Sequence, residues 1–213
     1  MADRLLLHLL HFPVRSLGPG VRTGLWVQGC RRHCPGCIFP EGWDFSEDRA
    51  KPLDDVEALL RLYMNRTPAP DGLTISGGEP FDQPEALIGL LRRVRDMGVG
   101  DVLIYSGYSL DALLDLCPEL PDLAAALVDG PFEMGNKTDS TWRGSSNQNL
   151  TIWRTKYSAR YEEWEGVEDR RLQLVTDEGR KFLVGIPKQE DVERLKSGII
   201  NLGKSYGGCY GTG

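Results

Sequence analysis

The sequence of 213 residues has no long apolar run, no long basic run and no internal repeat. Its most apolar stretch near the start, residues 5–10, includes His8 and is much shorter than the roughly 20 residues that a membrane-spanning helix needs. We therefore expect no signal peptide and no membrane partner. A net charge of −6 without a basic run also argues against nucleic acid as a partner.

Cysteine is scarce and unevenly placed. The chain has five cysteines, an odd number that is not spread along the sequence as a disulfide framework would be. This pattern excludes a small secreted disulfide scaffold and favours a reducing, cytoplasmic location. With 40% hydrophobic and 26% charged residues, a chain of this length can bury the core of one ordinary globular domain.

Three of the five cysteines, Cys30, Cys34 and Cys37, lie within eight residues in the spacing C-x3-C-x2-C. Closely spaced thiolates are typical ligands of iron–sulfur clusters, and three of them hold three irons of a four-iron cluster while the fourth iron stays open to a small ligand. Zinc is one alternative, with His33 as a fourth ligand, although His33 is adjacent to Cys34. The other alternative is cysteines that bind nothing, since three close thiols cannot all pair as disulfides.

Apolar strands alternate with segments of helical periodicity over the first two thirds of the chain. This alternation indicates βαβ units and a mostly parallel sheet, in an α/β fold whose ligands bind at the carboxyl ends of the strands. The helix after the third strand is expected to have Asp82 as its N-cap and Glu85 at the third position. The expected strands are residues 5–14, 21–28, 73–76, 102–105 and 125–128, and the expected helices are residues 56–64, 83–97 and 110–117.

Four segments with candidate ligand-binding residues lie directly after these expected strands: the cysteine loop and residues 77–80, 106–108 and 129–131. Gly77 and Gly78 allow a close backbone approach, and Glu79 can accept hydrogen bonds from an ammonium group. A tight turn with a solvated Glu79 is the alternative. Ser106 offers a hydroxyl, and Asp129 either contacts a ligand or caps the following glycine. We expect the four segments to meet at one edge of the sheet.

The residues after 157 differ in character from the rest. Residues 171–176 and 181–186 flank a turn sequence and predict a hairpin, and residues 187–196 predict a short helix. The glycine-rich tail, residues 203–213, is expected to be mobile or to order only against another surface. The region either faces a substrate or partner, or covers an open edge of the sheet.

Together, these motifs resemble the radical S-adenosylmethionine superfamily, and more narrowly its activating enzymes of the anaerobic ribonucleoside-triphosphate reductase. The resemblance covers about residues 5–150. The chain departs from the family's pattern in two ways. Gly36 stands where many members of the superfamily have an aromatic residue, and the last sixty residues exceed the compact activase pattern. The matching segments, in the family's order, are residues 18–22, 30–45, 77–80, 105–108 with 110–111, 127–132 and 143–148.

The resemblance implies a partial (β/α)6-type barrel of mostly parallel strands, with a radical S-adenosylmethionine core in residues 1–156 and a C-terminal extension in residues 157–213. It implies a 4Fe-4S cluster on Cys30, Cys34 and Cys37, with S-adenosylmethionine as the second cofactor. Gly78 and Glu79 would bind the methionine amino end, and Ser106 and Asn147 the ribose or carboxylate end. The implied cofactor-binding residues are Gly77, Gly78, Glu79, Ser106, Asp129 and Asn147.

The activity implied by the resemblance is reductive cleavage of S-adenosylmethionine to a 5′-deoxyadenosyl radical, which takes hydrogen from a backbone glycine of a partner glycyl-radical enzyme. A flavodoxin- or ferredoxin-type protein would donate the electron. One alternative is a radical S-adenosylmethionine enzyme that modifies a peptide or small molecule and uses the extension to recognise it. Another is a non-enzymatic metal-binding module. The two remaining cysteines, Cys117 and Cys209, are too few for an auxiliary all-cysteine cluster, which favours the activase.

Overall fold

The computed structural model describes residues 3–166, 170–177 and 180–192. Its strands are β1 (Arg4–Val14), β2 (Arg22–Val27), β3 (Ala50–Pro52), β4 (Gly72–Gly77), β5 (Val102–Tyr105), β6 (Ala126–Asp129), β7 (Asn149–Ile152), β8 (Gln173–Asp177) and β9 (Arg180–Val184). Its α-helices are α1 (Leu53–Met64), α2 (Pro84–Asp96), α3 (Leu110–Leu116), α4 (Leu120–Leu123) and α5 (Ser158–Glu165). Short 3-10 turns cover Pro40–Gly42, Glu47–Arg49, Pro80–Asp82, Thr155–Tyr157 and Gln189–Asp191.

Seven of these strands form one sheet in the order β3-β1-β2-β4-β5-β6-β7. The central strands β2, β4, β5 and β6 are parallel, whereas β1, β3 and β7 pair antiparallel at the two edges. Leu25, Ile75, Ile104 and Leu127 stand opposite one another across the parallel strands, so that their side chains form one apolar row. The mixed α/β fold and the mostly parallel central sheet are confirmed. The sheet does not close into a barrel.

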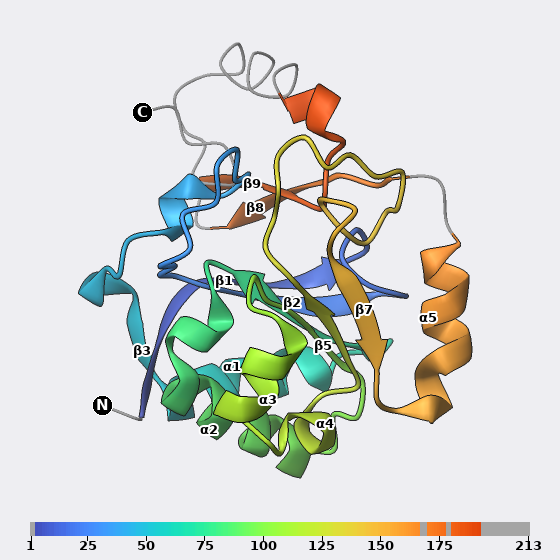
Figure 1. Cartoon of the computed structure of the whole chain (residues 1–213). Coiled ribbons are helices and arrows are strands. Elements are labelled where there is room, and N and C mark those ends of the chain that lie inside the picture. The colour runs from blue at the N-terminus through green and yellow to red at the C-terminus, as the bar shows by residue number, and fades with distance from the viewer. Residues whose placement is uncertain (1–2, 167–169, 178–179, 193–213) are drawn as a thin grey trace.

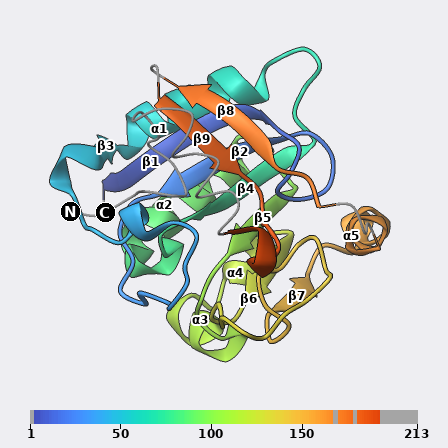
Figure 2. The ribbon, with the colours of Figure 1, turned by 90° about the horizontal axis from the view of Figure 1, so that it is seen from above.

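The two faces of the sheet are covered differently (Figure 1). Helices α1 to α4 pack on one face, where they bury the largest core cluster together with residues such as Leu25 and Ile75. The β8–β9 hairpin lies on the other face and crosses β1 and β2 (Figure 2). There Val175 and Phe182 pack against Leu17 and Trp26. The hairpin expected from the sequence is therefore confirmed, and it covers sheet surface that the helices leave open.

Helix α5 was not expected from the sequence, because its segment has only a narrow apolar face. Tyr161 is fully buried and packs with Trp142 against the end of the sheet. The helix predicted at residues 187–196 is present as a 3-10 turn at Gln189–Asp191, and its part after residue 192, like the glycine-rich tail and Cys209, lies outside the described residues.

The expected helix N-cap at Asp82 is wrong. Gln83 is the residue that precedes α2, and Pro84 occupies the first helical position, where its missing N–H costs nothing. The buried carboxylate of Asp82 instead accepts hydrogen bonds from the backbone N–H of Arg31 at 2.6 Å and from the hydroxyl of Tyr108 at 2.7 Å. Asp82 thus connects the cysteine loop to the loop after β5.

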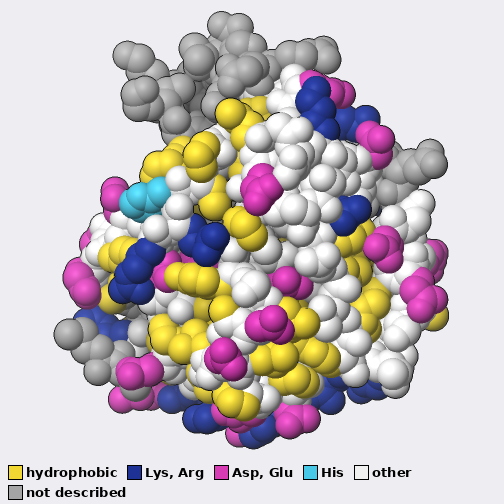
Figure 3. Space-filling model, in the orientation of Figure 1, with side chains coloured by type: hydrophobic (Ala, Val, Ile, Leu, Met, Phe, Trp, Pro, Cys, Tyr) yellow, Lys and Arg dark blue, Asp and Glu magenta, His cyan; other side chains and the backbone are white. Residues whose placement is uncertain are grey.

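Two features of the structure correspond to the lack of long apolar and long basic runs in the sequence: the distribution of charge on the surface and the character of the helices. Basic side chains on the face drawn in Figure 3 are intermixed with acidic ones rather than gathered in one patch. Within the described residues, no helix has the length and apolar character required to cross a membrane.

Candidate functional site

Four segments meet at the carboxyl ends of the parallel strands, as expected. The cysteine loop follows β2, and the other three segments begin where β4, β5 and β6 end, at Gly77, Tyr105 and Asp129. Residues from the first three of these segments line one cavity of about 190 Å³, together with Phe132, Gly144 and Gln148 from the long connection between β6 and β7.

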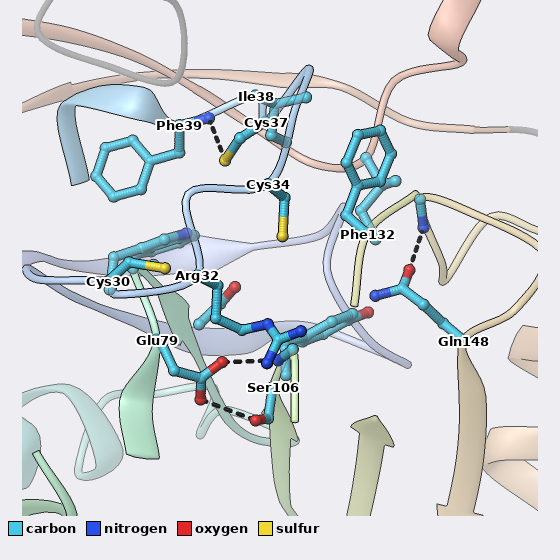
Figure 4. A pocket seen from close by; sticks show the side chains of 18 of the residues that line it. Cys30, Arg32, Cys34, Cys37, Ile38, Phe39, Glu79, Ser106, Phe132 and Gln148 are labelled. Carbon is cyan, nitrogen blue, oxygen red and sulfur yellow. Dashed lines mark hydrogen bonds between the residues drawn. The ribbon is translucent and has the colours of Figure 1, made fainter. Parts of the chain in front are cut away.

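The three cysteines of the loop lie in this cavity (Figure 4). Cys30 is 9% exposed, and Cys34 and Cys37 are half-buried. All three are free thiols that border the same space. Burial raises the pKa of Cys30 and Cys37, and the backbone N–H of Phe39 donates a hydrogen bond of 3.4 Å to the sulfur of Cys37. The cavity therefore presents three free sulfur donors.

The three cysteines can be compared with the donors that a single metal ion would need. Among the described residues, no three His, Cys, Asp or Glu side chains converge closely enough to hold one metal ion. His33 is exposed and is not among the described residues that line the cavity, and its ring stacks on Trp43 at 4.6 Å between centroids. Three thiols that border one cavity suit a group with several irons, in which each sulfur binds a different metal. The donor set fits the three protein ligands of a four-iron cluster.

The cysteine loop is held at its base by the chain that follows it. The backbone N–H of Cys30 bonds to the carbonyl of Trp43 at 2.9 Å. The side chain of Gln28 donates to the carbonyls of Glu41 and Asp44 at 2.7 and 3.0 Å and accepts a bond from His8 Nδ1 at 2.8 Å. Residues 41–44 thus brace the loop from β2.

Gly77, the last residue of β4, and Gly78, which follows it, allow this segment to approach β2 closely. Gly77 has a φ of +114°, and a Cβ atom there would lie 2.4 Å from the backbone nitrogen of Val27. A Cβ atom on Gly78 would lie 2.2 Å from the carbonyl oxygen of Gly29. Both distances are too short for any side chain. Because of this approach, the backbone N–H of Glu79 bonds to the carbonyl of Gly29 at 2.8 Å, directly before Cys30.

Glu79 is buried, with 2% of its surface exposed, so it is not the solvated residue of the turn alternative. Its Oε1 accepts bonds from Ser106 Oγ at 2.8 Å and the Phe81 N–H at 3.1 Å, and its Oε2 accepts one from the Gly107 N–H at 2.7 Å (Figure 4). Burial raises the pKa of Glu79 to about 7, although these three hydrogen bonds oppose the shift. Glu79 therefore joins the ends of β4 and β5 on the floor of the cavity.

The other predicted site residues are placed differently. Ser106 lines the cavity, with its hydroxyl bonded to Glu79. Asp129 and Asn147 are not among the described residues that line it. Asp129 accepts a bond from the Leu110 N–H at 3.3 Å, and Asn147 donates to the carbonyl of Pro131 at 2.8 Å. Gln148, next to Asn147, does line the cavity.

Sequence reasoning missed two groups of cavity residues. The first is Arg32, whose guanidinium lies 4.9 Å from the ring centroid of Tyr108 and which lines the cavity beside the cysteines. Its position in the sequence between Cys30 and Cys34, two candidate metal ligands, was the signal that could have identified it as a cavity residue. The second group is residues 185–192 after β9, for which no motif gave a signal.

Lowering the pH should destabilise the metal-free protein through His8. Its ring is buried, Nε2 has no partner among the described residues, and burial lowers the pKa of His8 from 6.5 to about 4. Because the unfolded chain binds a proton at His8 below about pH 6.5 and the folded chain does so only near pH 4, stability falls as the pH falls through this window. Between pH 7.5 and 4.5 we expect His8→Gln to lose on the order of 2 kcal/mol less than wild type in urea unfolding. Equal losses would contradict this.

Comparison with known proteins agrees with the geometry. A family model described as a 4Fe-4S single cluster domain matches residues 16–151. The chain is 34% identical over 147 residues to the anaerobic ribonucleoside-triphosphate reductase-activating protein of Escherichia coli (strain K12), an alignment that covers 65% of this chain and 93% of the relative. Its Haemophilus influenzae counterpart is 32% identical over 148 residues, with 66% and 94% coverage. The pyruvate formate-lyase-activating enzyme of Clostridium pasteurianum is 34% identical over 94 residues, with 43% and 39% coverage.

Proposed function

Because the chain belongs to the 4Fe-4S single cluster domain family, we propose that it is a radical S-adenosylmethionine enzyme that activates a glycyl-radical partner, an enzyme like the anaerobic ribonucleoside-triphosphate reductase. Its cofactors are a 4Fe-4S cluster and S-adenosylmethionine. The observation that carries the proposal is that three free cysteines share one cavity at the carboxyl ends of parallel strands. With both cofactors bound, they supply a one-electron cleavage whose product removes a hydrogen atom from a glycine.

The residues of the chain then have separate tasks. Cys30, Cys34 and Cys37 hold the cluster. Gly77 and Gly78 let the backbone of the β4 end lie against the cysteine loop, and Glu79 fixes this end to the next strand. Glu79 lines the cavity, and its carboxylate would accept bonds from the ammonium of S-adenosylmethionine. Ser106 supports Glu79, and Asp129 and Asn147 act from outside the cavity lining by holding the neighbouring loops.

We extend the proposal to the architecture and the setting. The central strands and their helices form a partial (β/α)6-type barrel, with residues 1–156 as the radical S-adenosylmethionine core and residues 157–213 as an extension. A flavodoxin- or ferredoxin-type protein donates the electron in the cytoplasm. The division into core and extension is supported by the family match, which ends at residue 151, and the barrel-type architecture by the position of the cavity at the carboxyl ends of the parallel strands.

The experiment uses full-length protein, reconstituted anaerobically with iron and sulfide, reduced with dithionite and mixed with S-adenosylmethionine and the anaerobic ribonucleoside-triphosphate reductase of the source organism. We expect 5′-deoxyadenosine and a glycyl-radical signal in electron paramagnetic resonance, which is absent with a reductase whose radical glycine is alanine. Cleavage without the radical would assign the enzyme to a peptide or small-molecule substrate. Failure to bind iron or to cleave the cofactor would reject the radical S-adenosylmethionine assignment.

Glu79→Ala should weaken cofactor binding and leave the cluster in place. The variant loses the acceptor for Ser106 and for two backbone N–H groups, so the loop after β5 loses its connection to the β4 end. We expect the Kd for S-adenosylmethionine, from equilibrium dialysis of the reconstituted protein, to rise at least about tenfold, equivalent to 1.4 kcal/mol. Iron content should stay near that of wild type. Lost iron with normal cofactor binding would refute the assigned role.

A further inference from the structure

The segment after β9, residues 185–192, forms one wall of the cavity that contains the cysteines. Its residues that line the cavity are Gly185, Ile186, Pro187, Gln189 and Val192. The family match ends at residue 151, about 34 residues before this wall begins. The cavity is therefore completed by a part of the chain that the family model does not include.

The wall is held on both sides. On one side it continues from β9, whose Phe182 and Val184 are buried against Trp26 and Leu17. On the other side, Gln189 accepts a bond from the Gly135 N–H at 3.0 Å and donates to the Gly144 carbonyl at 3.3 Å. Arg170 adds bonds to the carbonyls of Pro187 and Thr138 at 2.9 and 2.6 Å. The 185–192 segment is thus fastened to the long β6–β7 connection across the cavity.

The side of this wall that lines the cavity carries no charge. Ile186, Pro187 and Val192 share the cavity with Ile38 and Phe132. None of the three charged residues of the segment lines the cavity. Lys188 lies 3.9 Å from Asp139, and Glu190 lies 3.7 Å from Lys137. The third is Asp191. Among the described lining residues, the charged ones are Arg32 and Glu79, which come from the cysteine loop and the β4 end.

We propose that residues 185–192 select the substrate, by contacting an extended, glycine-bearing backbone segment of the partner protein where it enters the cavity. This inference rests on the proposed function and assigns part of the substrate recognition to the extension. A small charged metabolite would find no counter-charge on this wall, and burying its charge there would be costly. An uncharged peptide segment without bulky side chains needs none.

The first test narrows the cavity at the 185–192 segment. Ile186→Trp adds volume inside the cavity, and Leu174→Trp is the matched control, because Leu174 lies on β8 of the same hairpin, is 59% exposed and does not line the cavity. The reductase is the probe. We expect Ile186→Trp to raise the half-saturating concentration of the reductase roughly tenfold. The variant should also lower the ratio of glycyl radical formed to S-adenosylmethionine cleaved. Leu174→Trp should match wild type in both. Equal behaviour of the two variants would reduce the extension to a cover of the sheet.

The second test needs no partner and opens the wall instead. Gln189→Ala removes two hydrogen bonds between the segment and the β6–β7 connection, and it leaves the contacts of Arg170, Lys188 and Glu190 in place. We expect the iron chelator bathophenanthroline disulfonate to remove iron from Gln189→Ala roughly fivefold faster than from wild type. It should remove iron from Ile186→Trp more slowly than from wild type. If both variants lose iron at the wild-type rate, residues 185–192 do not control access to the cavity, and the proposal is wrong. If wild type cleaves the cofactor but activates no reductase, the partner in the proposed function is wrong while this measurement still decides the role of the wall.

Discussion

Cys34→Ala is expected to lower the iron retained after anaerobic reconstitution at least tenfold and to abolish cleavage of S-adenosylmethionine. In the proposed cluster each of the three thiols in the cavity holds one iron, and losses of 10–100-fold in affinity are typical even for residues that only support a metal ligand. Among the described cysteines, only Cys30 and Cys37 also line the cavity, and each is already assigned an iron of its own, so none is left to replace Cys34. Iron and acid-labile sulfide counts, with the visible absorption spectrum, provide the measurement.

Cys117→Ala is the matched control for this prediction. Cys117 is 2% exposed and packs in the core on the helical side of the sheet, where a free cysteine behaves as a small hydrophobic residue. This variant should keep the full iron content and lose only some stability. Iron retained in Cys34→Ala, or stoichiometric zinc with no iron in wild type, would contradict the cluster.

The sequence predicts the sheet and the edge at which the site forms because both depend on local patterns. Apolar runs place β2, β4, β5 and β6, and a segment that follows a parallel strand must lie at its carboxyl end. The cysteine spacing identifies the candidate metal ligands for the same reason, since all three lie on one short loop.

The missed features depend on contacts between distant parts of the chain. Asp82 is a reasonable helix cap by its local sequence, but its carboxylate is used by Arg31 and Tyr108, which lie 51 and 26 residues away. The 185–192 wall contains no recognisable motif, and only the packing of the β8–β9 hairpin on the sheet brings it to the cavity. Helix α5 depends in the same way on the burial of Tyr161.

Asp101→Ala is expected to destabilise the metal-free protein by about 3–5 kcal/mol, as is typical when one partner of a buried ion pair is removed. Arg22 is fully buried at the start of β2, at the opposite end of this strand from the cysteine loop. Its guanidinium makes two bonds to the carboxylate of Asp101, at 3.1 and 3.2 Å. Asp101 also accepts bonds from Arg160 at 3.1 Å and Tyr161 at 2.7 Å. Its loss leaves a buried cation without a counter-charge.

Arg22→Met should cost less than Asp101→Ala, because Asp101 keeps Arg160 and Tyr161 as partners when Arg22 is gone. Urea unfolding measures both variants, and Arg92→Ala, which removes an exposed ion pair with Glu119, is the control with little or no effect.

The double variant Arg22→Met/Asp101→Leu separates charge burial from lost packing. If the unpaired charge of Arg22 is the main cost, the double variant is more stable than Asp101→Ala alone, since both buried charges are gone and apolar side chains fill their places. If the losses of the single variants simply add, the pair stabilises the fold by its contacts, and the charge of Arg22 is not what makes Asp101 necessary.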